Sequence, residues 1–120
     1  MEVFLKWSVR LCPEFAAEFR TYDERFREEL ISQMEVLEAL GPMLGRPRVD
    51  TLNGSRYCNM KELRFRFGEG VWRVAFAFDP SRCAVLLVAG DKAGVGQGRF
   101  YQKLIAQADE RFGRYLSGEV

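Results

Sequence analysis

The side chains of this chain that could do chemistry are mainly cations on or beside predicted strands. Cations fixed on a sheet can hold phosphate oxygens and neutralise the negative charge of a pentavalent transition state. Arginine grips phosphate with two parallel donors, whereas lysine acts as a point charge. Taken singly, an outward strand arginine can equally serve solubility alone, so the pattern by itself indicates only binding to a polyanion. The cations in question are Lys61, Arg64, Arg66, Arg73 and Lys92.

Proton transfer would need further groups, and few residues offer them. Asp91 lies in a glycine-flanked segment and could act as a base or orient Lys92, although a turn-forming aspartate is the alternative. Tyr57 and Tyr101 carry hydroxyls that could donate a proton. Tyrosines at the edges of elements are more often packed with their hydroxyls in water, so neither is singled out.

The composition excludes several classes of site. The chain has no histidine, which removes Ser-His-Asp and Cys-His hydrolases. Its three cysteines are odd in number and widely spaced, so we expect neither a disulfide framework nor a zinc site. Any catalysis must therefore use Lys, Arg, Tyr, Asp or Glu, and we expect no metal and no cofactor.

The net charge of +1 conceals an uneven distribution along the chain. Residues 13–40 hold eight acidic and three basic side chains, a net charge of −5. Residues 41–73 hold seven basic and three acidic side chains, a net charge of +4. Such asymmetry favours an anionic partner on one side of the molecule.

The N-terminal third predicts one strand and two helices. The strand has the two-residue alternation of a half-buried segment. Pro13 fits the first turn of the short helix that follows. Thr21 and Glu24 have the spacing of a capping box for the longer helix. The predicted elements are a strand at 2–10 and helices at 13–20 and 21–40.

The remainder predicts three strands in an antiparallel meander and a closing amphipathic helix. Residues 43–58 are rich in turn formers and show no sustained period, so they hold at most a short strand. The third strand of the meander is apolar throughout, which suits an interior strand buried on both faces. We expect strands at 63–67, 71–78 and 83–89 and a helix at 97–116. This order is typical of an α+β fold, here as one domain over residues 1–120.

No segment is apolar enough to cross a membrane, and the N-terminus lacks the pattern of a secretory signal. We therefore expect a cytoplasmic protein that does not interact with membranes.

Several blocks of residues stand in a recognisable order along the chain. They are Arg-Pro at 46–47, Val-Asp-Thr-Leu at 49–52, Gly-Ser-Arg at 54–56, Asn-Met-Lys-Glu-Leu-Arg at 59–64, the strand at 71–80, Ala-Gly-Asp-Lys at 89–92 and the tail at 99–112. In order and spacing, these blocks resemble the HigB-like, phage-derived branch of the RelE/ParE toxin superfamily. The resemblance covers nearly the whole chain.

The resemblance implies a RelE-like fold and a metal-independent endoribonuclease that cuts messenger RNA on the ribosome, leaving 2′,3′-cyclic phosphate and 5′-hydroxyl ends. By the same motifs, Arg64 and Arg73 would bind the phosphate, and Lys61 and Lys92 would assist attack or protonate the leaving group. Asp91 is a weaker catalytic candidate. RNA-binding positions would be Arg56, Arg66, Arg99 and Lys103.

The implied partners are a cognate helix-turn-helix antitoxin, the ribosome and messenger RNA. Two alternatives stay open. ParE-like members of the superfamily bind DNA gyrase without cutting nucleic acid, but they typically lack a full cationic cluster. A catalytically inactive, phage-derived interaction protein is the other alternative.

Overall fold

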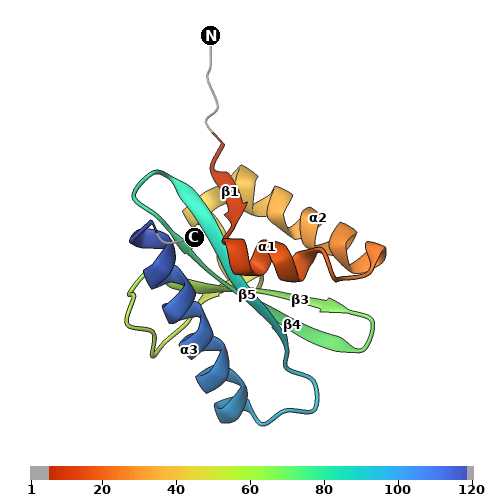
Figure 1. Cartoon of the computed structure of the whole chain (residues 1–120). Coiled ribbons are helices and arrows are strands. Elements are labelled where there is room, and N and C mark those ends of the chain that lie inside the picture. The colour runs from red at the N-terminus through yellow and green to blue at the C-terminus, as the bar shows by residue number, and fades with distance from the viewer. Residues whose placement is uncertain (1–5, 119–120) are drawn as a thin grey trace.

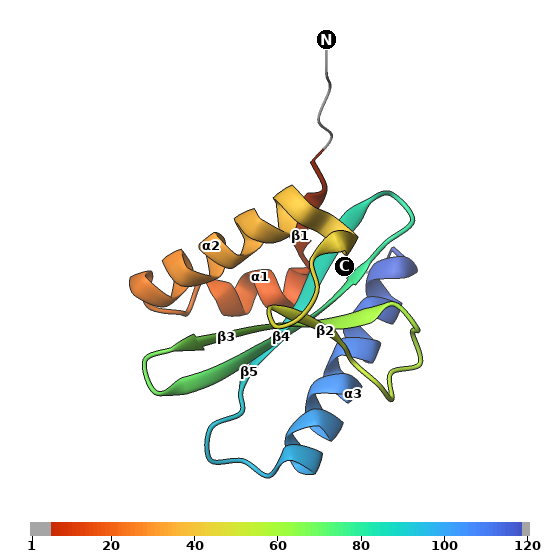
Figure 2. The ribbon, with the colours of Figure 1, turned by 180° about the vertical axis from the view of Figure 1, so that it is seen from behind.

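The computed structural model describes residues 6–118, which form three layers (Figures 1 and 2). One face of a five-stranded sheet carries helices α1 (Pro13–Phe19) and α2 (Glu24–Leu40), and the other face carries α3 (Gln97–Leu116). A short 3-10 helix, Gly41–Met43, follows α2. No helix within these residues has the length and apolar character needed to span a lipid bilayer. The strands are β1 (Ser8–Leu11), β2 (Val49–Thr51), β3 (Met60–Phe67), β4 (Gly70–Phe78) and β5 (Cys83–Asp91).

The sheet has the strand order β1-β5-β4-β3-β2. The meander predicted from the sequence is confirmed, because β3, β4 and β5 are antiparallel neighbours. The structure adds a strand on each side of it. β2 pairs antiparallel with β3, and β1 pairs parallel with β5. Helices α1 and α2 carry the chain from β1 to β2 at the opposite edge of the sheet, and β3 and β4 bring it back to β5 beside β1.

The first strand is shorter than predicted. It begins at Ser8 instead of residue 6 or 7, and residues 2–5 of the predicted strand lie outside the described residues. The backbone N–H of Trp7 donates to the Glu38 carbonyl at 3.0 Å, at the end of α2. The indole lies against Gly41, where an added Cβ would be 2.3 Å from the ring. The indole also meets Phe78 of β4, with ring centroids 5.0 Å apart, so Trp7 packs between the end of α2 and the sheet.

The capping box predicted at Thr21 is wrong. Asp23 is the N-cap of α2, and its carboxylate accepts the Phe26 N–H at 2.9 Å. The Thr21 hydroxyl instead donates to the Glu18 carbonyl at 2.6 Å, in the turn that ends α1. Both side chains satisfy helix ends, but of different helices.

Strand alternation divides β3 between the two faces of the sheet. Phe65 and Phe67 contact Phe26 of α2, with ring centroids 6.1 and 5.3 Å apart. The alternate residues Glu62 and Arg64 must therefore face the side of α3. α3 packs mainly on β4 and β5, so Arg64 on this part of β3 stays partly exposed beside it, although Glu62 is buried.

Candidate functional site

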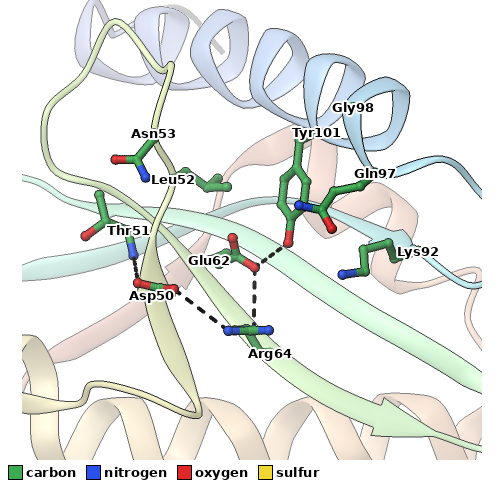
Figure 3. A pocket seen from close by; sticks show the side chains of 10 residues that line it. All are labelled: Asp50, Thr51, Leu52, Asn53, Glu62, Arg64, Lys92, Gln97, Gly98 and Tyr101. Atoms are coloured by element: carbon green, nitrogen blue, oxygen red, sulfur yellow. Dashed lines mark hydrogen bonds and ion pairs between the residues drawn. The ribbon is translucent and has the colours of Figure 1, made fainter.

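A pocket of about 540 Å³ lies where α3 leaves β3 open (Figure 3). Its volume is within the range usual for ligand sites. The walls come from β2 and the residues after it, from β3, from the residue after β5 and from the first turns of α3. The lining side chains that could bind a ligand or transfer a proton are Asp50, Glu62, Arg64, Lys92, Gln97 and Tyr101.

A buried hydrogen-bonded network forms the base of this pocket. The Tyr101 hydroxyl donates to Glu62 Oε1 at 2.8 Å, as Figure 3 shows. Arg73 Nε lies 3.1 Å from the same carboxylate oxygen and donates to the Tyr101 hydroxyl at 3.3 Å. Glu62 and Arg73 are both only 6% exposed, so each charge depends on the other for compensation.

The protonation state of Tyr101 follows from this environment. Burial raises the pKa of the phenol, and the hydrogen bond to Glu62 raises that pKa further, against the opposing effect of Arg73. The hydroxyl therefore stays protonated at neutral pH. It presents a fixed hydrogen-bond donor that already points at a carboxylate.

Two cations lie nearer the opening of the pocket. Arg64 Nη1 is 3.8 Å from Asp50 Oδ2, and its Nε is 3.7 Å from Glu62 Oε1. These distances exceed hydrogen-bond length, so the guanidinium retains donors for another anion. Lys92 places its ammonium nitrogen 5.8 Å from the centroid of the Tyr101 ring. Both cations thus border the space above Tyr101.

Arg73 occupies a different position from the one expected for a phosphate-binding cation. It faces the same side of the sheet as Arg64, its cross-strand partner in the β3–β4 ladder. However, it lies behind Glu62 and Tyr101 instead of lining the pocket, and its Nη1 donates to the Trp72 carbonyl at 3.0 Å. Its positive charge is thus committed to holding Glu62.

Two further sequence candidates lie away from the pocket. Lys61 precedes Glu62, so strand alternation turns it to the opposite face, where its ammonium group donates to the Thr51 hydroxyl at 3.2 Å. Asp91 Oδ1 accepts the backbone N–H groups of Val71 and Ala93, each at 2.9 Å. Asp91 therefore fastens the turn that carries Lys92, which corresponds to the turn-forming alternative.

The structure does not gather the four expected RNA-binding cations into one patch. Arg66 is exposed on β3, two residues beyond Arg64. Arg99 and Lys103 line a second pocket, on another flank of α3. Arg56 lies at the far end of α3, with its guanidinium carbon 5.4 Å from the Tyr57 ring centroid.

Sequence reasoning passed over Glu62 and set Tyr101 aside. The signal for Glu62 was present, because it shares the strand parity of Arg64. Nothing in the spacing could show that Tyr101, 39 residues later, donates to it. The tertiary structure alone brings these two residues together.

Comparison with known proteins gives a family for the chain. The family model described as phage-derived protein Gp49-like matches residues 17–113. HigB3 of Mycobacterium tuberculosis, described as a candidate toxin, is 41% identical over 112 residues, or 93% of this chain and 96% of that protein. HigB2 of the same organism, also a candidate toxin, is 47% identical over 96 residues. That match covers 79% of this chain but 47% of HigB2, so the chain spans about half the length of that relative.

Two solved structures share the fold at low sequence identity. The E. coli toxin RelE, as an arginine-to-alanine double variant in the free state, has a TM-score of 0.57 and 12% identity, covering 88% of this chain and 97% of that chain. A chain of the archaeal RelE–RelB complex from Pyrococcus horikoshii has a TM-score of 0.53 and 14% identity, covering 74% of this chain and 98% of that chain. These likenesses confirm the predicted α+β, RelE-like fold. Together with the family match, they show that the chain belongs to the phage-derived Gp49-like family, the HigB-like branch of the RelE/ParE toxin superfamily.

Proposed function

We propose that this chain is the toxin of a type II toxin–antitoxin system and inhibits translation by cutting messenger RNA on the ribosome. The observation that carries the proposal is the pocket beside α3. It combines two cations at its opening with a protonated tyrosine on a buried carboxylate at its base. That combination suits an anionic substrate whose reaction requires proton transfer.

The cations would hold the scissile phosphate. Arg64 has donors free for a bidentate contact, and Lys92 supplies a point charge from the other wall. Together they would neutralise the charge that builds on the phosphate oxygens during attack. Arg73 would act indirectly, because it holds Glu62 and Tyr101 in place and its charge is paired with Glu62 instead of the substrate.

The proposed reaction is an internal transesterification. The ribose 2′-oxygen forms a bond to the adjacent phosphorus while the bond from phosphorus to the 5′-oxygen breaks. Tyr101 takes the proton of the 2′-hydroxyl as it passes its own proton to Glu62, and the Lys92 ammonium protonates the departing 5′-oxygen. The products are a 2′,3′-cyclic phosphate and a 5′-hydroxyl, and no metal enters the balance.

The partners follow from the same proposal. One of the solved neighbours is a RelE–RelB complex, which supports a protein antitoxin as partner of this chain also. We propose a helix-turn-helix antitoxin in that role, with the ribosome and messenger RNA as the targets of the free toxin.

A cell-free translation reaction tests the proposal. Purified protein is added with and without ribosomes, and new RNA 5′ ends are mapped by primer extension. We expect ends within codons only when ribosomes are present. The double variant Arg64→Ala with Lys92→Ala should lower cleavage by about a hundredfold or more, as loss of transition-state donors does elsewhere. Arg25→Ala, which removes an exposed cation on α2, is the matched control and should leave cleavage unchanged.

Either of two outcomes would contradict the proposal. Intact RNA in the presence of folded protein would exclude the nuclease and direct the next assay to DNA gyrase. Equal cleavage by the parent and the double variant would show that this pocket is not the site.

A further inference from the structure

One edge of the sheet is only partly covered. β1 pairs with β5 along Cys83–Leu86 and goes no further. The next carbonyl, Leu87, accepts a hydrogen bond from Arg111 Nη1 at 2.7 Å. From residue 88 to the end of β5, the strand pairs with β4 on one side only, and no described strand lies on the other side.

Backbone groups on this edge are available for pairing. The Lys92 N–H donates to the carbonyl of Val71 in β4 at 2.8 Å. Alternation along the strand then turns the N–H and C=O groups of Ala89 and Asp91 away from β4. An unpaired row of this kind is a template for an added strand.

A groove runs alongside the open edge. It has a volume of about 320 Å³ and lies between β5 and one flank of α3. Phe100 and Leu104 form an apolar wall, and Val95, which is 42% exposed, continues it. Arg99 and Lys103, one helical turn apart, are exposed along its rim.

The charge of the groove selects its occupant. Its one carboxylate, Asp91, already accepts two backbone N–H groups through Oδ1, which leaves the two rim cations as the dominant charges. We infer that this groove binds an extended, acidic segment of a partner protein, which adds as a strand beside residues 88–91. Apolar side chains of the segment rest on the exposed Val95, and its carboxylates face Arg99 and Lys103. Main-chain pairing of this kind supplies affinity, and the alternate side-chain pockets supply specificity.

RNA is the competing occupant, since the family resemblance assigns the same two cations to RNA binding. The groove favours protein because its distinctive feature is the open strand edge, which pairs with a peptide backbone. It also lies on a different flank of α3 from the pocket that holds Tyr101 and Lys92. The inference does not rest on the proposed nuclease activity, and its test requires no RNA cleavage.

The test uses an eight-residue peptide of alternating glutamate and valine, titrated into isotope-labelled full-length protein and followed by NMR. We expect shifts at residues 88–91 and 99–107, and slower amide exchange at Ala89 and Asp91. The double variant Arg99→Glu with Lys103→Glu should weaken binding by about tenfold, equivalent to about 1.4 kcal/mol. It should also gain affinity for the matching lysine–valine peptide.

Matched controls keep the result specific. Arg20→Glu with Arg25→Glu reverses two exposed cations on the α1 and α2 side and should leave the affinity unchanged. A peptide with N-methylated backbone should lose binding, because it lacks strand donors. Shifts at the outer edge of β2 instead, an unchanged affinity in the charge-reversal variant, or tighter binding of single-stranded RNA in the same groove would each overturn the inference.

Discussion

At the scale of single residues, the main finding is that Arg73 forms an ion pair with Glu62 and is not placed to bind a substrate directly. Its guanidinium compensates Glu62 within a part of the molecule that water hardly reaches. A buried ion pair that loses one partner leaves an uncompensated charge, which costs more than the pair itself contributes. The stability of the fold and the integrity of the pocket are therefore coupled at Arg73.

We predict that Arg73→Met lowers the free energy of unfolding by roughly 3 kcal/mol, because the buried Glu62 loses its nearest cation and keeps only the partly exposed Arg64 at 3.7 Å. Glu62→Gln combined with Arg73→Met should recover much of this loss. Urea unfolding of the parent, both single variants and the double variant measures the coupling between the two residues. Strictly additive effects would show that the two side chains do not compensate each other.

Tyr101 leads to a prediction about high pH. Its folded-state pKa is raised above the ordinary value of 10.0, chiefly by burial and then by Glu62. The stability that this shift contributes is therefore complete below pH 10 and is lost as the pH rises through the folded-state pKa. Tyr101→Phe removes that loss, so its unfolding free energy should fall less steeply than that of the parent above pH 10.

Urea denaturation of both proteins between about pH 8 and 11 checks the slope. Tyr22 and Tyr115, whose pKa values are also raised, are present in both proteins and cancel in the difference. Parallel stability curves would contradict the environment assigned to Tyr101. At neutral pH, the variant should fold yet lose RNA cleavage, since it has no hydroxyl to relay a proton.

At the scale of elements, α3 is held across the sheet edge to α1. Arg111 Nη1 and Nη2 donate to the two carboxylate oxygens of Glu18 at 2.8 and 2.7 Å, and Nη1 also reaches the Leu87 carbonyl. Arg114 adds a second connection, to Glu14. These contacts fix one end of α3, while its other end presents Tyr101 to the pocket.

We predict that Arg111→Met lowers the free energy of unfolding by about 2 kcal/mol, because it removes charge-assisted hydrogen bonds from a side chain that is only 12% exposed. Arg99→Met, at an exposed position on the same helix, is the control and should change stability by less than about 0.5 kcal/mol. Thermal and urea unfolding measure both. Equal effects of the two substitutions would show that the Glu18 connection is not a stabilising contact.

At the scale of the whole molecule, the layers separate charge. The acidic segment 13–40 forms α1 and α2 on one face of the sheet, while the pocket with Arg64 and Lys92 opens on the other face. A long anion approaching the molecule is therefore attracted to the face of the pocket and repelled from the helical face. This separation suits a protein that must dock on RNA in one orientation.

We predict a strong dependence of RNA binding on salt. Single-stranded RNA blocked against cleavage by 2′-O-methyl groups is titrated by fluorescence anisotropy at several salt concentrations. Arg64→Ala should reduce the slope of log affinity against log salt by about 0.7, the value for one lost phosphate contact on a single strand. Arg25→Ala on the acidic face should leave the slope unchanged. The same change of slope in both variants would indicate binding without a preferred face.

The sequence by itself determined the order of the elements and the class of the fold. Periodicity is a local property, so it marked the meander and the closing helix closely. The end of α2 at a glycine-proline pair and the buried character of β5 also followed from local chemistry. The alternation of side chains along β3 places Arg64 on the face opposite Phe65 and Phe67. The same alternation places Lys61 on the other face from Arg64, although both are cations of one strand.

Only the tertiary structure decided which of these residues meet. The pairing of β1 with β5, the union of Glu62 with Tyr101, and the burial of Arg73 behind them all join residues far apart in the chain. Such contacts depend on how α3 lies across the sheet, and no local pattern encodes that placement. The same placement of α3 sends Arg99 and Lys103 to a groove of their own, so a set of cations that looks continuous in the sequence becomes two separate sites.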